Sequence, residues 1–350
     1  MRHIVRAAGG VLLVLAGCST APHGGNAPHG TFAPVELKPA PPEPYVRVLN
    51  SDSNKVELQI AVRKFVPSDP AVRGPVVWLT GVSHIGETNY FEALQRHLDA
   101  QSLVLFEGVG EHEAGHEPRP AERAAMSQDK GNDSSLQSAM AAALGLEFQL
   151  EAIDYTSPRF RNSDLSIPQL RKVMARAETE STNAPGAPGA AQTFEGLLQM
   201  MQGGSWFDTL VQFGLRVLGS DPHLQALSKL ALIEMLGQMQ GDPAHLRGLP
   251  PNLKQLLEVL IQERNRKVLG DLKTELHKKP GPASVALFYG TGHMPDLEEG
   301  LWRQLKFVPA EQVWYTAVSV DLARSGIMPA ERQFIHTLIK SELEQLQARP

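Results

Sequence analysis

Residues 76–84 read VVWLTGVSH, an apolar run that ends at a glycine and is followed three residues later by His84. A short apolar run of this kind predicts a buried strand, and residues 88–100 predict a helix with Phe91, Leu94 and Leu98 on one face. Turns that join a buried strand to a helix are where α/β folds place their chemistry. We therefore treat His84 as a candidate site residue.

The same pattern returns near the other end of the chain. Residues 285–289 form an apolar run, residues 290–293 read GTGH, and a polar helical stretch with Leu297, Leu301 and Leu305 follows. The chain thus carries G-x-x-H twice, each time after a predicted strand and before a predicted helix. We interpret this as a weak internal repeat that presents His84 and His293 on equivalent turns.

The bulk composition is that of a globular protein. The chain has 350 residues, of which 42% are hydrophobic and 20% charged, which is enough for one large domain with an insertion. The formal net charge is −5 and aromatic residues make up 6%. Neither a basic surface nor a base-stacking surface is expected, so we predict no nucleic-acid partner.

The N-terminus predicts a lipid-anchored protein of the bacterial cell envelope. Residues 1–17 combine a basic start with a short apolar run, and Leu15-Ala16-Gly17-Cys18 resembles the lipobox of bacterial lipoproteins. The run is too short to span a bilayer. An ordinary signal peptide is the alternative, but Cys18 is the only cysteine. Acylated Cys18 would bind the bilayer, and Ser19 in place of Asp favours the outer membrane, facing the periplasm or cell surface. Residues 18–44 are rich in Pro and Gly and predict a tether.

The folded domain is expected to span residues 45–350. It opens with a β-hairpin, because residues 56–62 alternate apolar and polar side chains after a first strand at 45–49. Residues 102–106 predict the next buried strand, which ends at Glu107. A carboxylate at a strand end, beside His84 on a neighbouring strand, has the geometry of a metal ligand or a general base. A solvated glutamate at the start of a loop is the alternative.

A second histidine pattern follows directly. Residues 112–116 satisfy H-E-x-x-H, a zinc-protease motif that works only on a helix. Glycines at 108, 110 and 115 and prolines at 118 and 120 indicate a loop instead. We therefore do not place the catalytic centre there, and expect a polar loop over the site.

The middle of the chain predicts mainly helices, with a helical insertion at about 165–250. Residues 150–155 predict a short strand that ends at Asp154, and Asp164 falls in a polar loop. A long amphipathic helix covers 253–276 and contains Glu263-Arg264-Asn265-Arg266. A charged group on a helix is usually a solvated face. Arg264, however, falls near the apolar stripe and could point inward to an anion.

Together, the paired G-x-x-H motifs, the strand that ends at Glu107 and the helix that carries Glu-Arg-Asn resemble the TraB/GumN/Tiki superfamily over about residues 45–320. The resemblance implies an α+β fold, with a central mixed sheet built from two related halves and flanked by helices. It also implies a site that contains His84, Glu107, Arg264 and His293. One difference is that no arginine closely follows Glu107, since Arg119 is the first candidate. A more distant resemblance is to haem-binding lipoproteins of the ChaN type.

Two functions follow as expectations. In the first, His84, Glu107 and His293 hold a divalent metal and the protein hydrolyses peptide or amide bonds, with Arg264, Asp154 and Asp164 near the substrate. Zn, Mn, Co and Fe fit such ligands about equally. In the second, the protein is a non-catalytic surface lipoprotein that binds haem, metal or a polypeptide. The sequence leaves a peptide and a small-molecule substrate open.

Overall fold

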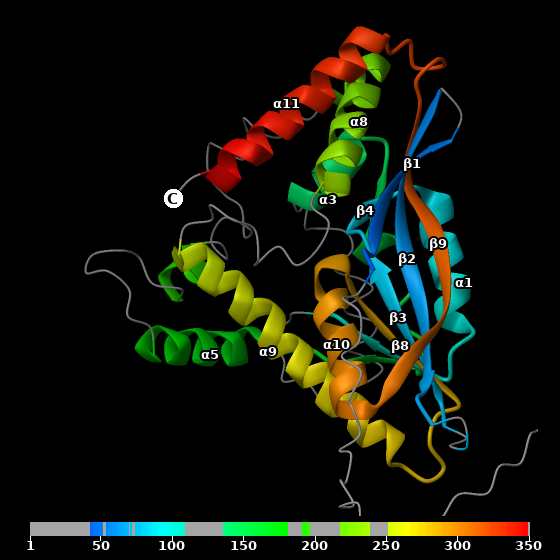
Figure 1. Ribbon diagram of the computed structural model, residues 1–350, viewed down its shortest axis with the longest axis vertical. Helices are drawn as coiled ribbons and strands as arrows, with labels where there is room; N and C mark the ends of the chain where they lie inside the picture. The colour runs from blue at the N-terminus through cyan, green and yellow to red at the C-terminus, as the bar shows by residue number, and fades with distance from the viewer. Residues whose placement is uncertain are drawn as a thin grey trace, which may run out of the picture. The chain divides into compact units, whose positions relative to one another are not determined.

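The computed structural model describes residues 43–51, 54–69, 71, 74–108, 136–180, 191–196, 218–238 and 251–348. These residues form a mixed seven-stranded sheet flanked by helices (Figure 1), so the predicted α+β fold class is confirmed. The strands are β1 (Val46–Ser51), β2 (Lys55–Pro67), β3 (Val76–Val82), β4 (Ile85–Gly86), β5 (Leu103–Phe106), β6 (Glu147–Phe148), β7 (Phe160–Asn162), β8 (Ser284–Gly290) and β9 (Phe307–Asp321). The helices are α1 (Thr88–Asp99), α3 (Leu136–Ala143), α4 (Gln149–Ala152), α5 (Ile167–Glu180), α8 (Pro222–Gln238), α9 (Pro251–Leu276), the 3₁₀ turn η3 (Thr291–His293), α10 (Met294–Leu305) and α11 (Pro329–Ala348).

The strand order is β1-β2-β3-β8-β5-β7, with β9 paired to β2. The hairpin of β1 and β2 is antiparallel, as the alternation at 56–62 predicts. The four strands β3, β8, β5 and β7 run parallel to one another. Because parallel strands end at the same edge of a sheet, all four deliver the residues that follow them to one place.

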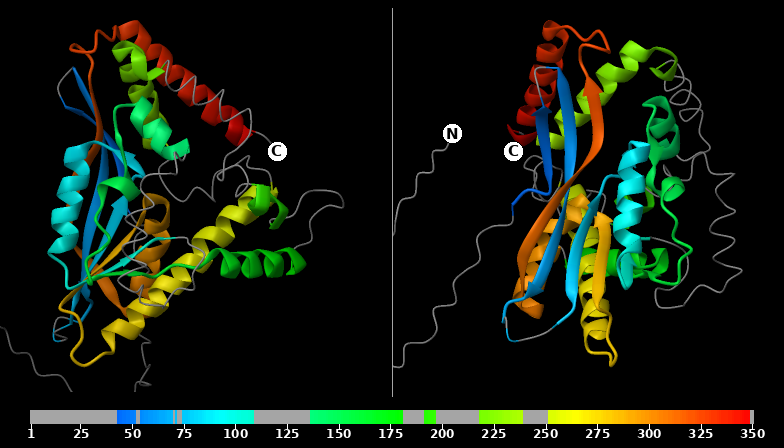
Figure 2. Two further views of the ribbon diagram at one scale, coloured as in Figure 1. Left: turned by 180° about the vertical axis from the view of Figure 1, so that it is seen from behind. Right: turned by 90° about the vertical axis from the view of Figure 1, so that its right-hand side faces the viewer.

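Apolar side chains alternate between the two faces of the sheet and build a core on each. On one face, Leu58, Ile60 and Phe288 pack with buried residues of α1 and α8. On the other face, Leu79 and Leu287 pack with residues of α9 and α10. Figure 2 shows α1 and α10 on opposite sides of the sheet. The two strand-turn-helix units therefore pair through their strands but cover different faces.

Three details of the sequence prediction are wrong. Residues 150–155 are not a strand: Gln149–Ala152 is a helical turn, which follows the β4–β6 bridge directly. The supposed loop before Asp164 contains β7, a strand of three residues that is too short to give a periodic signal. Finally, Glu107 does not follow a neighbour of β3, because β8 lies between β3 and β5.

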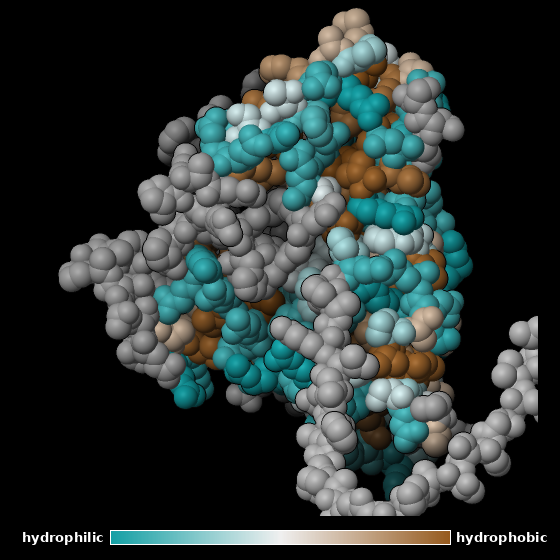
Figure 3. All heavy atoms as spheres, viewed as in Figure 1, coloured by the Kyte–Doolittle hydropathy of each residue, from teal (hydrophilic) through white to brown (hydrophobic). Residues whose placement is uncertain are grey.

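Other predicted helices have counterparts among the described residues. The helical insertion contains α5 and α8, and the long helix is α9. Figure 3 shows hydrophobic residues at the surface where α8 lies beside β1. Among the described residues, no helix has the length and apolarity that a bilayer crossing requires. The signal peptide, Cys18, the tether up to residue 42 and the H-E-x-x-H residues lie outside the described residues.

Candidate functional site

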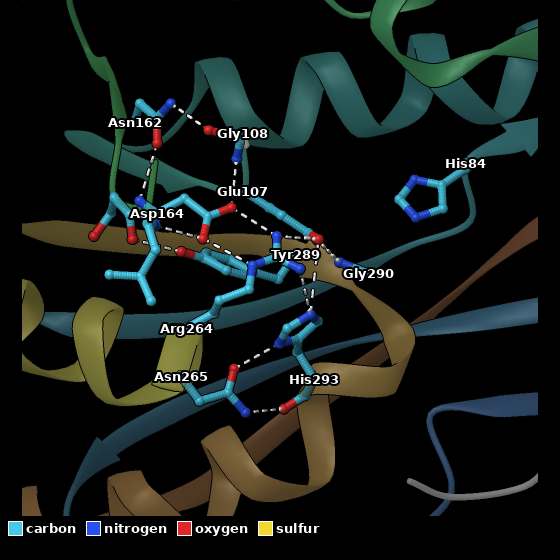
Figure 4. A network of polar contacts seen from close by, with 12 residues as sticks. His84, Glu107, Gly108, Asn162, Asp164, Arg264, Asn265, Tyr289, Gly290 and His293 are labelled. Atoms are coloured by element: carbon cyan, nitrogen blue, oxygen red, sulfur yellow. Dashed lines mark hydrogen bonds and ion pairs between the residues drawn. The ribbon is translucent and has the colours of Figure 1, made fainter. Parts of the chain in front are cut away.

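The parallel strands bring four predicted site residues to one edge of the sheet. His84 follows β3, His293 ends the turn after β8, Glu107 follows β5, and Asp164 follows β7. Arg264 reaches the same place from α9. Figure 4 shows Arg264 between Asp164 and Glu107, with His293 next to it. In the same view, His84 lies across Gly290 from His293. Both histidines therefore lie at the same edge of the sheet.

Arg264 is turned inward, and the anions that it meets are carboxylates of the protein itself. Its Nε and Nη2 donate to the two oxygens of Asp164, at 2.8 and 2.6 Å, and Nη2 also donates to Glu107 at 2.5 Å. Arg264 is 8% exposed and Asp164 only 1%. The two carboxylates raise the pKa of Arg264 further, although burial alone would lower it. Arg264 and Asp164 thus hold the cluster together from inside.

Glu107 stays ionised at any physiological pH. Burial would raise the pKa of its carboxyl group, but Arg264 and the backbone N–H of Gly290 outweigh burial and lower the pKa to about 2. The Gly290 N–H donates to Oε2 at 2.7 Å, while Oε1 accepts from Arg264. Each carboxylate oxygen can accept a second contact. Glu107 therefore presents a permanent negative charge with acceptor capacity to spare.

His293 is buried, and its ring orientation is fixed. Its Nδ1 lies 2.7 Å from Oδ1 of Asn265, and the Asn265 Nδ2 donates to the His293 carbonyl and to Asp296. Because those bonds assign the Asn265 amide, Oδ1 can only accept, so Nδ1 of His293 carries the proton. Burial lowers the pKa of His293 to about 4. The neutral ring therefore keeps a lone pair on Nε2, which accepts from Nη1 of Arg264 at 3.4 Å and lies 3.7 Å from Glu107 Oε1.

His84 is exposed, and its ring Nδ1 also faces a side-chain amide oxygen, here from α4. Its Nδ1 lies 3.0 Å from Oε1 of Gln149 in α4. Gly290 has no side chain, and the space that a Cβ would fill lies 3.8 Å from Nε2 of His84 and 3.4 Å from Oε2 of Glu107. The glycine thus leaves a gap between the imidazole and the carboxylate.

The remaining predicted residue, Asp154, lies at the exposed turn after α4. Its carboxylate accepts from the backbone N–H and the hydroxyl of Thr156, and its own N–H donates to Gln95 of α1. Sequence reasoning missed Asn265 and Gln149. Asn265 adjoins Arg264 on a helix, which is a usable signal. Gln149 carries no such signal, because its partner lies 65 residues away.

The donor set suits a divalent cation. Both imidazoles offer Nε2, Glu107 offers a carboxylate, and the two carboxylates and one guanidinium leave one negative charge when the histidines are neutral. Histidine ligands in metal sites usually donate their other ring N–H to an oxygen, as both do here. Within the described residues, no group of three or more His, Cys, Asp or Glu is already spaced for a metal. The ligand atoms would have to draw together around an ion.

Comparison of the chain with protein-family models, curated proteins and solved structures finds no match.

Proposed function

We propose that this protein is a lipid-anchored, metal-dependent hydrolase of peptide or amide bonds, in which His84, Glu107 and His293 hold the ion. The observation that supports the proposal is that both imidazoles carry their proton on Nδ1. Each Nδ1 faces an amide oxygen, so each ring carries its lone pair on Nε2, and that of His293 accepts from Nη1 of Arg264 at 3.4 Å until an ion takes its place. This is the arrangement that histidine ligands need.

The residues would divide the work as follows. His293 is neutral at physiological pH because burial lowers its pKa to about 4, so its Nε2 can bind without first losing a proton. Glu107 supplies charge rather than a proton, because its pKa is about 2. Arg264 holds Glu107 in place from inside. A bound Zn, Mn, Co or Fe ion would lower the pKa of water and polarise a carbonyl group.

A ChaN-like protein that binds haem, metal or a polypeptide without catalysis is the second candidate. This function would use Glu107, with its pKa of about 2, as a permanent anion and would need no general base. Both functions would use the same two histidines, so only a test for hydrolysis of peptide or amide bonds distinguishes them.

The deciding experiment measures metal content, metal affinity and peptide hydrolysis of the purified full-length protein. His84→Ala, His293→Ala and Glu107→Gln should each weaken the binding of Zn²⁺, Mn²⁺, Co²⁺ or Fe²⁺ by more than the ~10–100-fold that outer partners of a metal site contribute. Double variants should lose little beyond the worse single, because the three ligands act as a unit.

His277→Ala is the matched control, since this histidine is exposed and its ring Nδ1 lies 2.6 Å from the carbonyl oxygen of Lys273. It should change neither metal affinity nor turnover. A metal-loaded protein that hydrolyses no peptide or amide would support the binding function. A wild-type protein that binds none of the four metals would overturn the hydrolase.

A further inference from the structure

Gln149 is a buried polar residue that makes two bonds to His84. It is 3% exposed. Its side-chain Oε1 lies 3.0 Å from the ring Nδ1 of His84, and its backbone N–H donates to the carbonyl of His84 at 2.8 Å. The bridge between Ile85 and Phe148 brings the two segments together. The first turn of α4 is therefore attached to both the backbone and the ring of His84.

Tyr155 bonds the other end of the Gln149 amide. The amide Nε2 donates to the Tyr155 hydroxyl at 3.0 Å, so Oε1 is the atom that faces His84. Tyr155 itself packs against Phe106, Phe160 and Phe288, which fixes the position of its ring. An amide oxygen only accepts hydrogen bonds. Nδ1 of His84 must then carry the proton, and the lone pair is on Nε2, which lies 3.8 Å from the position that a Cβ on Gly290 would take.

We propose that Gln149 is a positioning residue, which holds His84 in the Nδ1–H tautomer with Nε2 turned toward Glu107. Its importance for catalysis rests on the proposed metal function, but the tautomer is a property of the metal-free protein. His84 needs such a partner more than His293 does, because it is exposed and water can bond either ring nitrogen. A glutamine that only fills buried space would have no effect on the tautomer.

The experiment records ¹⁵N spectra of histidine in the full-length, metal-free protein at pH ~8, where an ordinary histidine is neutral. His84→Ala identifies the signal of His84. The wild type should show Nδ1–H at His84. Gln149→Leu removes the acceptor and should give a mixture of tautomers, while Gln149→Glu keeps an acceptor and should restore Nδ1–H. An unchanged tautomer in Gln149→Leu would overturn the proposal.

Zn²⁺ affinity, measured by chelator competition, is the second readout. Gln149→Leu should weaken it by about 10–100-fold, and Gln149→Glu should recover most of the loss. If the wild type binds no Zn²⁺ but Gln149→Leu still changes the tautomer, the positioning role stands and the metal function fails. If Zn²⁺ binds and Gln149→Leu changes neither readout, the metal function stands and the positioning role fails.

Gln101→Leu is the matched control. Gln101 is also buried, at 6% exposure, and its amide donates to the carbonyl of His97, so the same substitution removes a comparable bond far from the site. It should leave the His84 tautomer and Zn²⁺ affinity unchanged. If Gln149→Leu does not fold, Tyr155→Phe replaces it in the test, because this variant removes the hydroxyl that the Gln149 amide bonds and leaves the amide free to turn. A fully retained Nδ1–H tautomer in Tyr155→Phe would then count against the proposal.

Discussion

The two G-x-x-H turns deliver their histidines to the same edge of the sheet by different local structures. After β8, the turn η3 runs directly into α10, and His293 is buried at 6% exposure. After β3, the chain forms the bridge strand β4 before α1 begins at Thr88, and His84 stays exposed. One histidine is held by Asn265 and the other by Gln149. The same four-residue pattern therefore fixes where a side chain lies but not how it is held.

The turn that carries His293 lies against the buried ion cluster of Arg264, Glu107 and Asp164, and among the described residues the turn that carries His84 has no such cluster. Arg264→Met should therefore have the largest effect on folding stability. It would leave Glu107 and Asp164 buried without their cation. Removing one partner of a buried ion pair costs about 3–5 kcal/mol of folding free energy. Chemical denaturation of the purified variant measures this loss.

The neighbouring Arg266→Met is the control. Its side chain is 68% exposed and pairs with Glu263 on the helix surface, so the expected loss is about 0–1 kcal/mol. Equal losses in the two variants would mean that the Arg264 cluster is not a buried one in solution.

The second prediction is a pH dependence of stability that the buried His293 should produce. Burial lowers the pKa of His293 from 6.5 to about 4, so below pH 6.5 the unfolded chain takes up a proton that the folded chain refuses. Stability therefore falls as the pH falls from about 6.5 to 4, and between pH 7 and 5 the loss is about 2 kcal/mol. His97 has the same shift by burial, so the test needs variants of His293 itself.

His293→Gln should flatten this pH dependence by about 2 kcal/mol over the same interval. The measurement is the free energy of unfolding at pH 7 and pH 5. A wild-type slope in His293→Gln would show that this histidine is not buried in solution.

Local patterns in the sequence were sufficient for the elements that carry the site. The alternation in β2 and the apolar runs of β3 and β8 predict their strands, and the placement of Arg264 on the apolar stripe of α9 predicts its inward direction. Glu107 was found because it stands directly after such a run, and the two histidines because each stands three residues after the glycine that follows one. Periodicity is a local property, so it identifies strands well.

The features that sequence reasoning missed are non-local. The place of β8 between β3 and β5 depends on pairing between segments about 180 residues apart, as with Leu103 and Val285. β7 is held by its neighbour rather than by a pattern of its own. Gln149 lies just before the stretch 150–155 that was predicted as a strand, and only the fold brings it to His84. The ligands could thus be predicted, whereas the groups that orient them could not.

The glycines of the two G-x-x-H motifs differ in the space around them. The motifs are offset by one residue in the β3–β8 pairing, since Val82, not Gly81, pairs with Gly290. A Cβ at Gly81 would come within 3.2 Å of the Ala61 carbonyl oxygen and 3.3 Å of Thr291, which is tight packing inside the sheet. A Cβ at Gly290 would instead lie at ordinary contact distance in the gap between Glu107 and His84. The first glycine serves packing, and the second leaves room at the site.

Alanine at these two positions should therefore have opposite effects. Gly81→Ala should cost about 1–3 kcal/mol of folding free energy through overpacking, with a smaller effect on metal affinity. Gly290→Ala should fold almost as well as the wild type, because its φ of −52° suits alanine and nothing must move. Its methyl group would fill the gap between imidazole and carboxylate and should weaken Zn²⁺ binding by ~10-fold, at the low end of changes made just outside a ligand set. Chemical denaturation measures the folding free energy of both variants, and chelator competition measures their Zn²⁺ affinity. If Gly290→Ala binds Zn²⁺ as the wild type does, the ion does not lie between His84 and Glu107, and the ligand set must be sought on the His293 side alone.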